Sequence, residues 1–393
     1  MADQIEALVK PELLIWARRM AGLDAEAAAR KIQVKRAKLE LWEAGEARPT
    51  IGQLRKLADV YKRPLGVFFL EDIPADEPLP ADFRRLDPTQ AEEFSPELRL
   101  AIRRVHLKRA MALELFEELN ERPPEFDATA GAMEDPEALA GRIRKMLGFG
   151  ESLPQGDMRE QFNVRRSAVE RAGVLVFQAE KIDTTEMRAF SIPQRPLPVV
   201  VLNIKDAFQA RSFSLFHELT HILLGNGGVC NLEENGRNSP PQRIEAFCNH
   251  VAGAVLIPID QLGRRPETPR RLVSGLSDDA IARLAVHFGV AKETVVRRLV
   301  IAKKVPLAFY QEKREEYRRA FAAAKKVDGG FAPPYTMALA GNGRLFTRLV
   351  LEAYADEKLG ARDVLEYLGT RVKHLPKIQT MLQSGSSEET GEP

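Results

Sequence analysis

Two histidines and a glutamate in the middle of the chain have the types and spacing of a metal-dependent hydrolase. His217, Glu218 and His221 form the pattern H-E-x-x-H. On a helix the two histidines lie one turn apart, with Cβ atoms roughly 5 to 6 Å apart, so both imidazoles can bind one metal ion. Zinc suits such ligands, and a catalytic zinc keeps one coordination position for water. Glu218 can then take a proton from that water, whose pKa the metal lowers to roughly 7.

The residues around this motif predict the helix that the chemistry requires. Residues 211–224 carry apolar side chains at three- and four-residue steps and contain no proline. We expect Ser212 or Ser214 to cap the start of this helix and Gly225 to end it. The alternative interpretation is a half-buried helix that carries two ordinary histidines. The glutamate between the histidines favours the metal site.

A catalytic zinc needs a third protein ligand, which we place on the next predicted helix. Residues 241–256 keep apolar side chains at helical spacing, and Glu245 is the acidic residue among them. Asn249 follows one turn later, so its amide oxygen can accept the N–H of a ligand histidine. For Glu245 the alternative is a surface carboxylate paired with Arg243. Other residues with suitable chemistry stay open as ligands, namely His250, Cys248, Cys230, Glu233 and Glu234.

The segment from about residue 173 to 258 resembles the ImmA/IrrE family of bacterial metallopeptidases. The resemblance rests on three apolar strands, GVLVFQAE, MRAFSI and PLPVVVLN, followed by FSLFHELTHILLG and an E-A-F-C-N helix that ends at LIP. It implies His217, His221 and Glu245 as ligands of Zn²⁺, with Mn²⁺ as the other candidate ion, and Glu218 as the catalytic carboxylate. Members of this family cut, or trigger the cutting of, helix-turn-helix repressors, which implies a repressor-type protein as substrate or partner.

Short helices separated by breaks fill the first 70 residues and resemble a repressor-type helix-turn-helix domain. The matching pieces are AGL, a second helix of small residues, W-E-A-G and the closing FFL. In that fold the third helix enters the major groove, so Lys35, Arg36 and Lys38 are the candidate DNA-binding residues. Alanine replaces the glutamine common in the second helix, and Glu40 adds negative charge. Binding to operator DNA and docking to another protein therefore both stay open.

The whole sequence predicts an α+β chain of several parts. With 393 residues and roughly 150 residues per domain, we expect two or three domains. We predict a helix-turn-helix domain at 1–72, a linker and long helix at 73–135, a zincin-like peptidase domain with a small sheet at 136–305, a C-terminal helical region at 306–383 and a disordered tail at 384–393. A second helix-turn-helix pattern at 277–303 is interpreted as two structural helices of the peptidase domain.

The small sheet offers a place for a peptide substrate. An extended peptide can add to the edge of a sheet as a further strand. We expect residues 199–202 or 187–192 to form that edge. For the oxyanion of the transition state, His250, Arg188 and Tyr310 are the candidate donors.

Composition limits the compartment and the partners. The formal net charge of +2 is too small to argue for a nucleic-acid partner by itself. Two cysteines cannot form a disulfide framework, the N-terminus lacks the features of a signal peptide, and no segment approaches the roughly 20 apolar residues of a membrane span. We therefore expect a cytoplasmic protein without membrane contact.

Two classes of function fit the sequence. The first is a zinc-dependent endopeptidase that acts on a regulatory protein. The second is a transcriptional regulator or antitoxin-like protein, with a toxin encoded nearby as its partner and little or no proteolysis. Glu218 favours the first, because a purely structural zinc would not need it.

Overall fold

The computed structural model describes residues 6–74, 94–131, 134–150, 154, 156–225, 228–230, 240–323 and 333–384. The chain divides into two units, Met1–Leu107 and Lys108–Pro393. Most of the predicted linker falls on residues 75–93, which lie outside the described residues. The same holds for residues 385–393 of the predicted C-terminal tail. Across the described ranges, none of the helices combines the length and the apolarity needed to cross a lipid bilayer.

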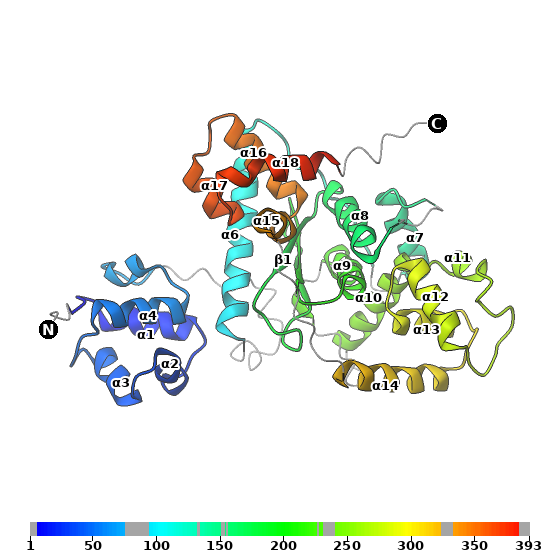
Figure 1. The fold of residues 1–393 in the computed structure, drawn as a ribbon, viewed down its shortest axis with the longest axis horizontal. Coiled ribbons are helices and arrows are strands. Elements are labelled where there is room, and N and C mark those ends of the chain that lie inside the picture. The colour runs from blue at the N-terminus through cyan, green and yellow to red at the C-terminus, as the bar shows by residue number, and fades with distance from the viewer. Residues whose placement is uncertain are drawn as a thin grey trace. The chain divides into compact units, whose positions relative to one another are not determined.

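The N-terminal unit contains short helices around one apolar core. These are α1 (Pro11–Met20), α2 (Ala25–Ile32), α3 (Arg36–Ala44) and α4 (Ile51–Tyr61), followed by the 3-10 helix η1 (Leu65–Phe69) (Figure 1). Asp24 and Thr50 cap α2 and α4 by accepting backbone N–H groups with their side chains. Trp42, Tyr61 and Phe68 are buried among these elements. The predicted all-α helix-turn-helix arrangement is confirmed. The long helix α6 (Pro96–Glu118) follows.

The second unit is built around a small mixed sheet. Its strands among the described residues are β1 (Leu175–Ala179), β2 (Ala189–Ile192), β3 (Val199–Asn203) and β4 (Gly228–Cys230), in the order β1-β3-β2-β4. β3 runs parallel to β1 and antiparallel to β2, and β2 runs antiparallel to β4. Every residue of the first three strands is buried, as their nearly continuous apolar sequences predict. The predicted α+β class is confirmed.

The predicted edge of this sheet is wrong. Residues 199–202 belong to β3, which lies between β1 and β2, while β2 has β4 on its other side. An apolar sequence such as VVVL indicates burial on both faces but does not identify the neighbouring strands. In the described part of the chain the outer strands are β1 and β4. The helix α15 (Pro334–Asn342) packs against β1, where Gln178 donates a hydrogen bond to the carbonyl of Ala340.

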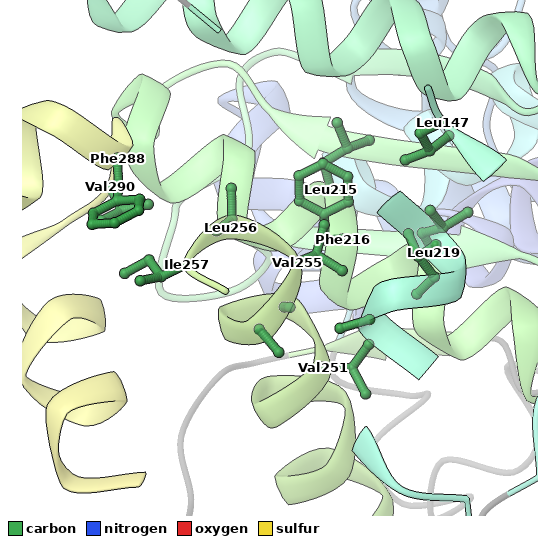
Figure 2. Packing of buried hydrophobic residues seen from close by; sticks show 14 of the residues in the cluster. Leu147, Leu215, Phe216, Leu219, Val251, Val255, Leu256, Ile257, Phe288 and Val290 are labelled. Atoms are coloured by element: carbon green, nitrogen blue, oxygen red, sulfur yellow. The ribbon is translucent and has the colours of Figure 1, made fainter. Parts of the chain in front are cut away.

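The helices of the central part of the second unit carry the candidate site. They are α7 (Pro136–Met146), α8 (Met158–Arg171), α9 (Phe208–Leu223), α10 (Pro240–Leu256), α11 (Ile259–Gly263), α12 (Asp278–Phe288), α13 (Lys292–Ile301) and α14 (Leu307–Ala323). Among them α8 and α9 contact the sheet, α9 through β2 and β3, and α10 packs against α9 and α7. In Figure 2, Leu215 and Leu219 of α9 belong to the same buried cluster as Val251 and Val255 of α10. This apolar contact fixes the two helices side by side.

Within the second unit, a buried carboxylate on α8 connects the C-terminal helices to the rest of the unit. They are α15, α16 (Arg344–Ala355), α17 (Ala361–Leu368), η3 (Val372–His374) and α18 (Leu375–Ser384). Oε1 of Glu170 on α8 accepts the backbone N–H of Arg344, the first residue of α16, at 2.9 Å. Gly343 has φ +77°, and a Cβ there would lie 2.0 Å from the same oxygen, so a side chain does not fit. Burial raises the pKa of Glu170 to about 7.

Candidate metal centre

α9 places the two motif histidines in one buried position. His217 and His221 are 0% and 5% exposed, and their Nε2 atoms lie 3.1 Å apart. The helix begins at Phe208 after the extended residue Ala207, which provides no side-chain cap. The predicted caps Ser212 and Ser214 are therefore wrong, because both lie inside the helix and are buried. Gly225 follows the helix with φ +68°, in agreement with the predicted end.

Glu245 on α10 completes a group of three potential ligands. Its Oε2 lies 3.2 Å from Nε2 of His217, and its Oε1 lies 3.2 Å from Nε2 of His221. Burial by itself would raise the pKa of Glu245, but hydrogen bonds with both histidines outweigh that effect and hold the pKa below its ordinary value. The contacts with the two histidines account for the position of the Glu245 carboxylate without the ion pair to Arg243 that was the alternative.

The spacing of these donor atoms fits a small divalent cation. Within the described residues, His217, His221 and Glu245 are the group whose ligand atoms lie close enough together to hold one ion, within 4.8 Å of one another. Around a tetrahedral zinc with ligand distances of about 2.0 to 2.1 Å, neighbouring donor atoms are about 3.3 Å apart. The observed 3.1 and 3.2 Å agree with that geometry. Two imidazoles and a carboxylate are also a donor set that manganese accepts.

The rival ligands of the sequence analysis do not belong to this group. His250 lies on α10, but its Nε2 is 2.7 Å from Oε1 of Glu137. Burial raises the pKa of the Cys248 thiol, which forms a hydrogen bond with His221 instead of joining the cluster. Glu233 and Glu234 lie outside the described residues, as does the side chain of Cys230.

Glu218 is fully buried; one of its carboxylate oxygens accepts a hydrogen bond, and the other has no hydrogen-bond partner within the described ranges. Its Oε2 accepts a hydrogen bond from Oγ of Ser191 at 2.7 Å. No group of the described residues hydrogen-bonds to its Oε1. Burial raises the pKa of Glu218, and the nearby His221 and His217 oppose this rise. A carboxylate in this environment can orient a water molecule and accept its proton.

Ser191 was missed by the sequence analysis. It is a single serine within the apolar strand AFSI, and alternation or composition gives no reason to select it. β2 turns its side chain toward α9, where it meets Glu218. Ser191 could have been selected from the sequence only by first placing its strand beside the helix that carries the H-E-x-x-H motif.

Asn249 lies on α10 where the sequence predicts it. It is 4% exposed and lies one turn after Glu245 on α10. Among the described residues, none accepts a hydrogen bond from Nδ1 of His217. Orientation of a ligand histidine by Asn249 therefore stays a prediction.

The three candidate oxyanion donors have other partners. His250 interacts with Glu137, as described above. Arg188 lies 3.6 Å from Asp206, and the hydroxyl of Tyr310 donates to Glu293 at 3.2 Å. These contacts give none of the three a link to Glu218, so their role in catalysis stays untested.

The candidate DNA-binding residues lie on the exposed side of the helix-turn-helix unit. Lys35 is the N-cap residue of α3, and Lys38 extends over the ring of Trp42 at 5.6 Å. Arg36 donates to Glu40 at 2.7 Å, an exposed pair one helical turn apart. Glu40 therefore neutralises one of the three positive charges on this surface.

Comparisons with known proteins identify both parts of the chain. The profile of the IrrE N-terminal-like domain matches residues 169–300, which contain the three potential metal ligands and Glu218. The profile of a helix-turn-helix domain matches residues 12–66. A search among curated proteins finds no match.

Proposed function

We propose that this chain, whose residues 169–300 match the IrrE N-terminal-like domain and whose residues 12–66 match a helix-turn-helix domain, is a zinc-dependent endopeptidase that acts on a repressor-type regulatory protein. The observation that supports this proposal most strongly is the buried Glu218 beside His217 and His221. A metal site that serves structure alone has no use for a buried carboxylate with an unsatisfied oxygen. Burying a carboxylate oxygen without a hydrogen-bond partner costs free energy, and a role of that oxygen in the reaction would explain why the fold keeps it there.

The proposed hydrolysis needs two kinds of residue, those that bind the metal ion and one that transfers protons. His217, His221 and Glu245 would hold the ion, and a bound Zn²⁺ supplies a polarised water and a Lewis acid for the peptide carbonyl. Glu218 orients the attacking water and takes its proton at Oε1, then returns the proton to the leaving amine. The buried position of both histidines keeps this proton transfer away from bulk solvent.

The outer strand β4 is the proposed binding edge for an extended substrate. Gly228 of β4 pairs with Ser191 of β2, and Ser191 contacts Glu218. Paired residues on antiparallel strands lie about 5 Å apart, so the backbone of a peptide added to the outer side of β4 would lie two strand spacings, roughly 10 Å, from that of Ser191. In contrast, α15 packs against β1 at the other side of the sheet. This arrangement replaces the edge strands predicted from the sequence.

The N-terminal domain would bring the peptidase to its target. It would bind operator DNA or dock onto the target protein, and Lys35, Arg36 and Lys38 are the proposed contacts for DNA. The second candidate function is a transcriptional regulator or antitoxin-like partner of a toxin encoded nearby, without proteolysis. The pairing of Arg36 with Glu40 weakens the basic surface expected for DNA binding, so in either function it favours docking to a protein over binding to operator DNA.

The experiment is incubation of the purified, zinc-loaded protein with helix-turn-helix repressors from the same genome. We expect cleavage that stops when a chelator removes the metal and resumes when zinc is added back. A stable complex with one of these repressors or with a neighbouring toxin, without cleavage at any metal concentration, would favour the regulator.

A further inference from the structure

We propose that Ser191 is a positioning residue that holds the catalytic carboxylate of Glu218 in its working orientation. This inference rests on the proposed peptidase function. It concerns the hydrogen bond of 2.7 Å from Oγ of Ser191 to Oε2 of Glu218, which lies outside the set of metal ligands.

The sheet fixes the hydroxyl of Ser191 in space. Ser191 is fully buried on β2, where its backbone is paired with Val200 of β3 on one side and Gly228 of β4 on the other. A strand with neighbours on both sides has little freedom to shift. The hydroxyl donor of Ser191 therefore belongs to the sheet, whereas the Glu218 carboxylate that accepts its hydrogen bond belongs to α9.

The hydrogen bond distinguishes the two oxygens of the carboxylate. Oε2 is held by Ser191, while no described residue hydrogen-bonds to Oε1. The terminal torsion of a glutamate side chain is broad, so an unheld carboxylate rotates easily. The distance of 2.7 Å is that of a well-formed O–H···O hydrogen bond, and it is made between two buried groups. Ser191 thus leaves Oε1 for the attacking water.

The chain provides a matched control at Ser214. This serine is also buried, on α9, and its Oγ has no hydrogen-bond partner among the described residues. Ser214→Ala therefore removes a buried hydroxyl one helical turn before Glu218 without removing a hydrogen bond to it. Ser191→Thr keeps the donor, while Ser191→Ala removes it.

The test combines crystal structures and kinetics of the zinc-loaded full chain in these three variants and the wild type. With Ser191→Ala we expect the Glu218 carboxylate to rotate or to occupy two conformers, with zinc content unchanged. With a repressor that the wild type cleaves as substrate, we expect kcat to fall about 10- to 100-fold while KM is retained. Ser191→Thr restores both the carboxylate position and most of kcat, and Ser214→Ala matches the wild type.

A Ser191→Ala structure with Glu218 unmoved would overturn the inference, as would a loss of kcat that Ser214→Ala shares. A lower unfolding temperature with kcat unchanged would assign Ser191 a purely structural role and would also overturn it. If the wild type cleaves nothing, the proposed function fails, but the position of Glu218 in the crystal structures still decides the role of Ser191.

Discussion

Nε2 of His217 and Oε2 of Glu245 lie 3.2 Å apart, although the two residues come from different helices. The distance is set by the apolar contact of α9 with α10, in which Leu219 and Val251 are both fully buried. The three potential metal ligands are therefore brought together by the packing of the domain rather than by one local motif.

This relationship predicts that Glu245 is required for metal binding. Glu245→Ala removes the only carboxylate of the three-residue group, and we expect the zinc affinity to fall by at least 100-fold in a competition titration with a chromophoric chelator. Cys248→Ala tests the rival ligand and should keep zinc affinity within about threefold, since its thiol lies outside the group. Equal zinc affinity of Glu245→Ala and the wild type would remove Glu245 from the site.

Glu137 is predicted to stabilise the peptidase unit. Its two carboxylate oxygens accept hydrogen bonds from Arg298 at 2.6 and 2.9 Å, and Arg298 is 1% exposed. Glu137→Ala leaves this buried guanidinium without its carboxylate, which should cost about 3 kcal/mol of unfolding free energy in a urea titration. Glu315→Ala breaks an exposed pair with Arg319 and should change little. Equal effects of both substitutions would contradict the prediction.

Glu170 is predicted to make stability depend on pH. Burial raises its pKa in the folded state to about 7, from an ordinary value of 4.5. An acid with a raised folded pKa contributes stability that is complete below about pH 4.5 and is lost as the pH rises through about 7. Urea titrations from pH 4.5 to 8 should show the wild type losing about 3 kcal/mol relative to Glu170→Gln. Parallel pH profiles of the two proteins would contradict the assignment.

The two lysines of the helix-turn-helix unit are predicted to contact DNA phosphates. Lys35→Ala and Lys38→Ala together should weaken binding to operator DNA and reduce the slope of log K against log salt by about 2, roughly one per lysine. Glu40→Gln should strengthen binding, because it releases Arg36 from its ion pair. Binding that is micromolar and insensitive to salt in the wild type would instead indicate a protein-docking role.

Much of the site could be predicted from the sequence because local spacing determines it. His217 and His221 are one helical turn apart in any helix, and a single acidic residue occurs on the following helical segment. The strand positions were also predictable, since the runs at β1 and β3 are apolar and short.

Features that depend on which elements are neighbours could not be predicted. β3 was expected at the edge of the sheet but lies inside it, because the strand order follows from tertiary packing. Ser191 gives no periodic signal, and its importance appears only when β2 lies beside α9. The start of α9 was also misplaced, since Ser212 and Ser214 satisfy the rules for a helix cap and yet lie inside the helix.

The most direct test compares the cleavage of helix-turn-helix repressors from the same genome by the wild type and by Glu218→Gln, both loaded with zinc. The amide keeps the shape of the side chain but cannot take a proton from water. We expect both proteins to bind one zinc, while the rate of repressor cleavage falls by roughly 10² to 10⁴ in the variant. Equal rates of cleavage by the two zinc-loaded proteins would contradict the assignment of Glu218 as the catalytic base.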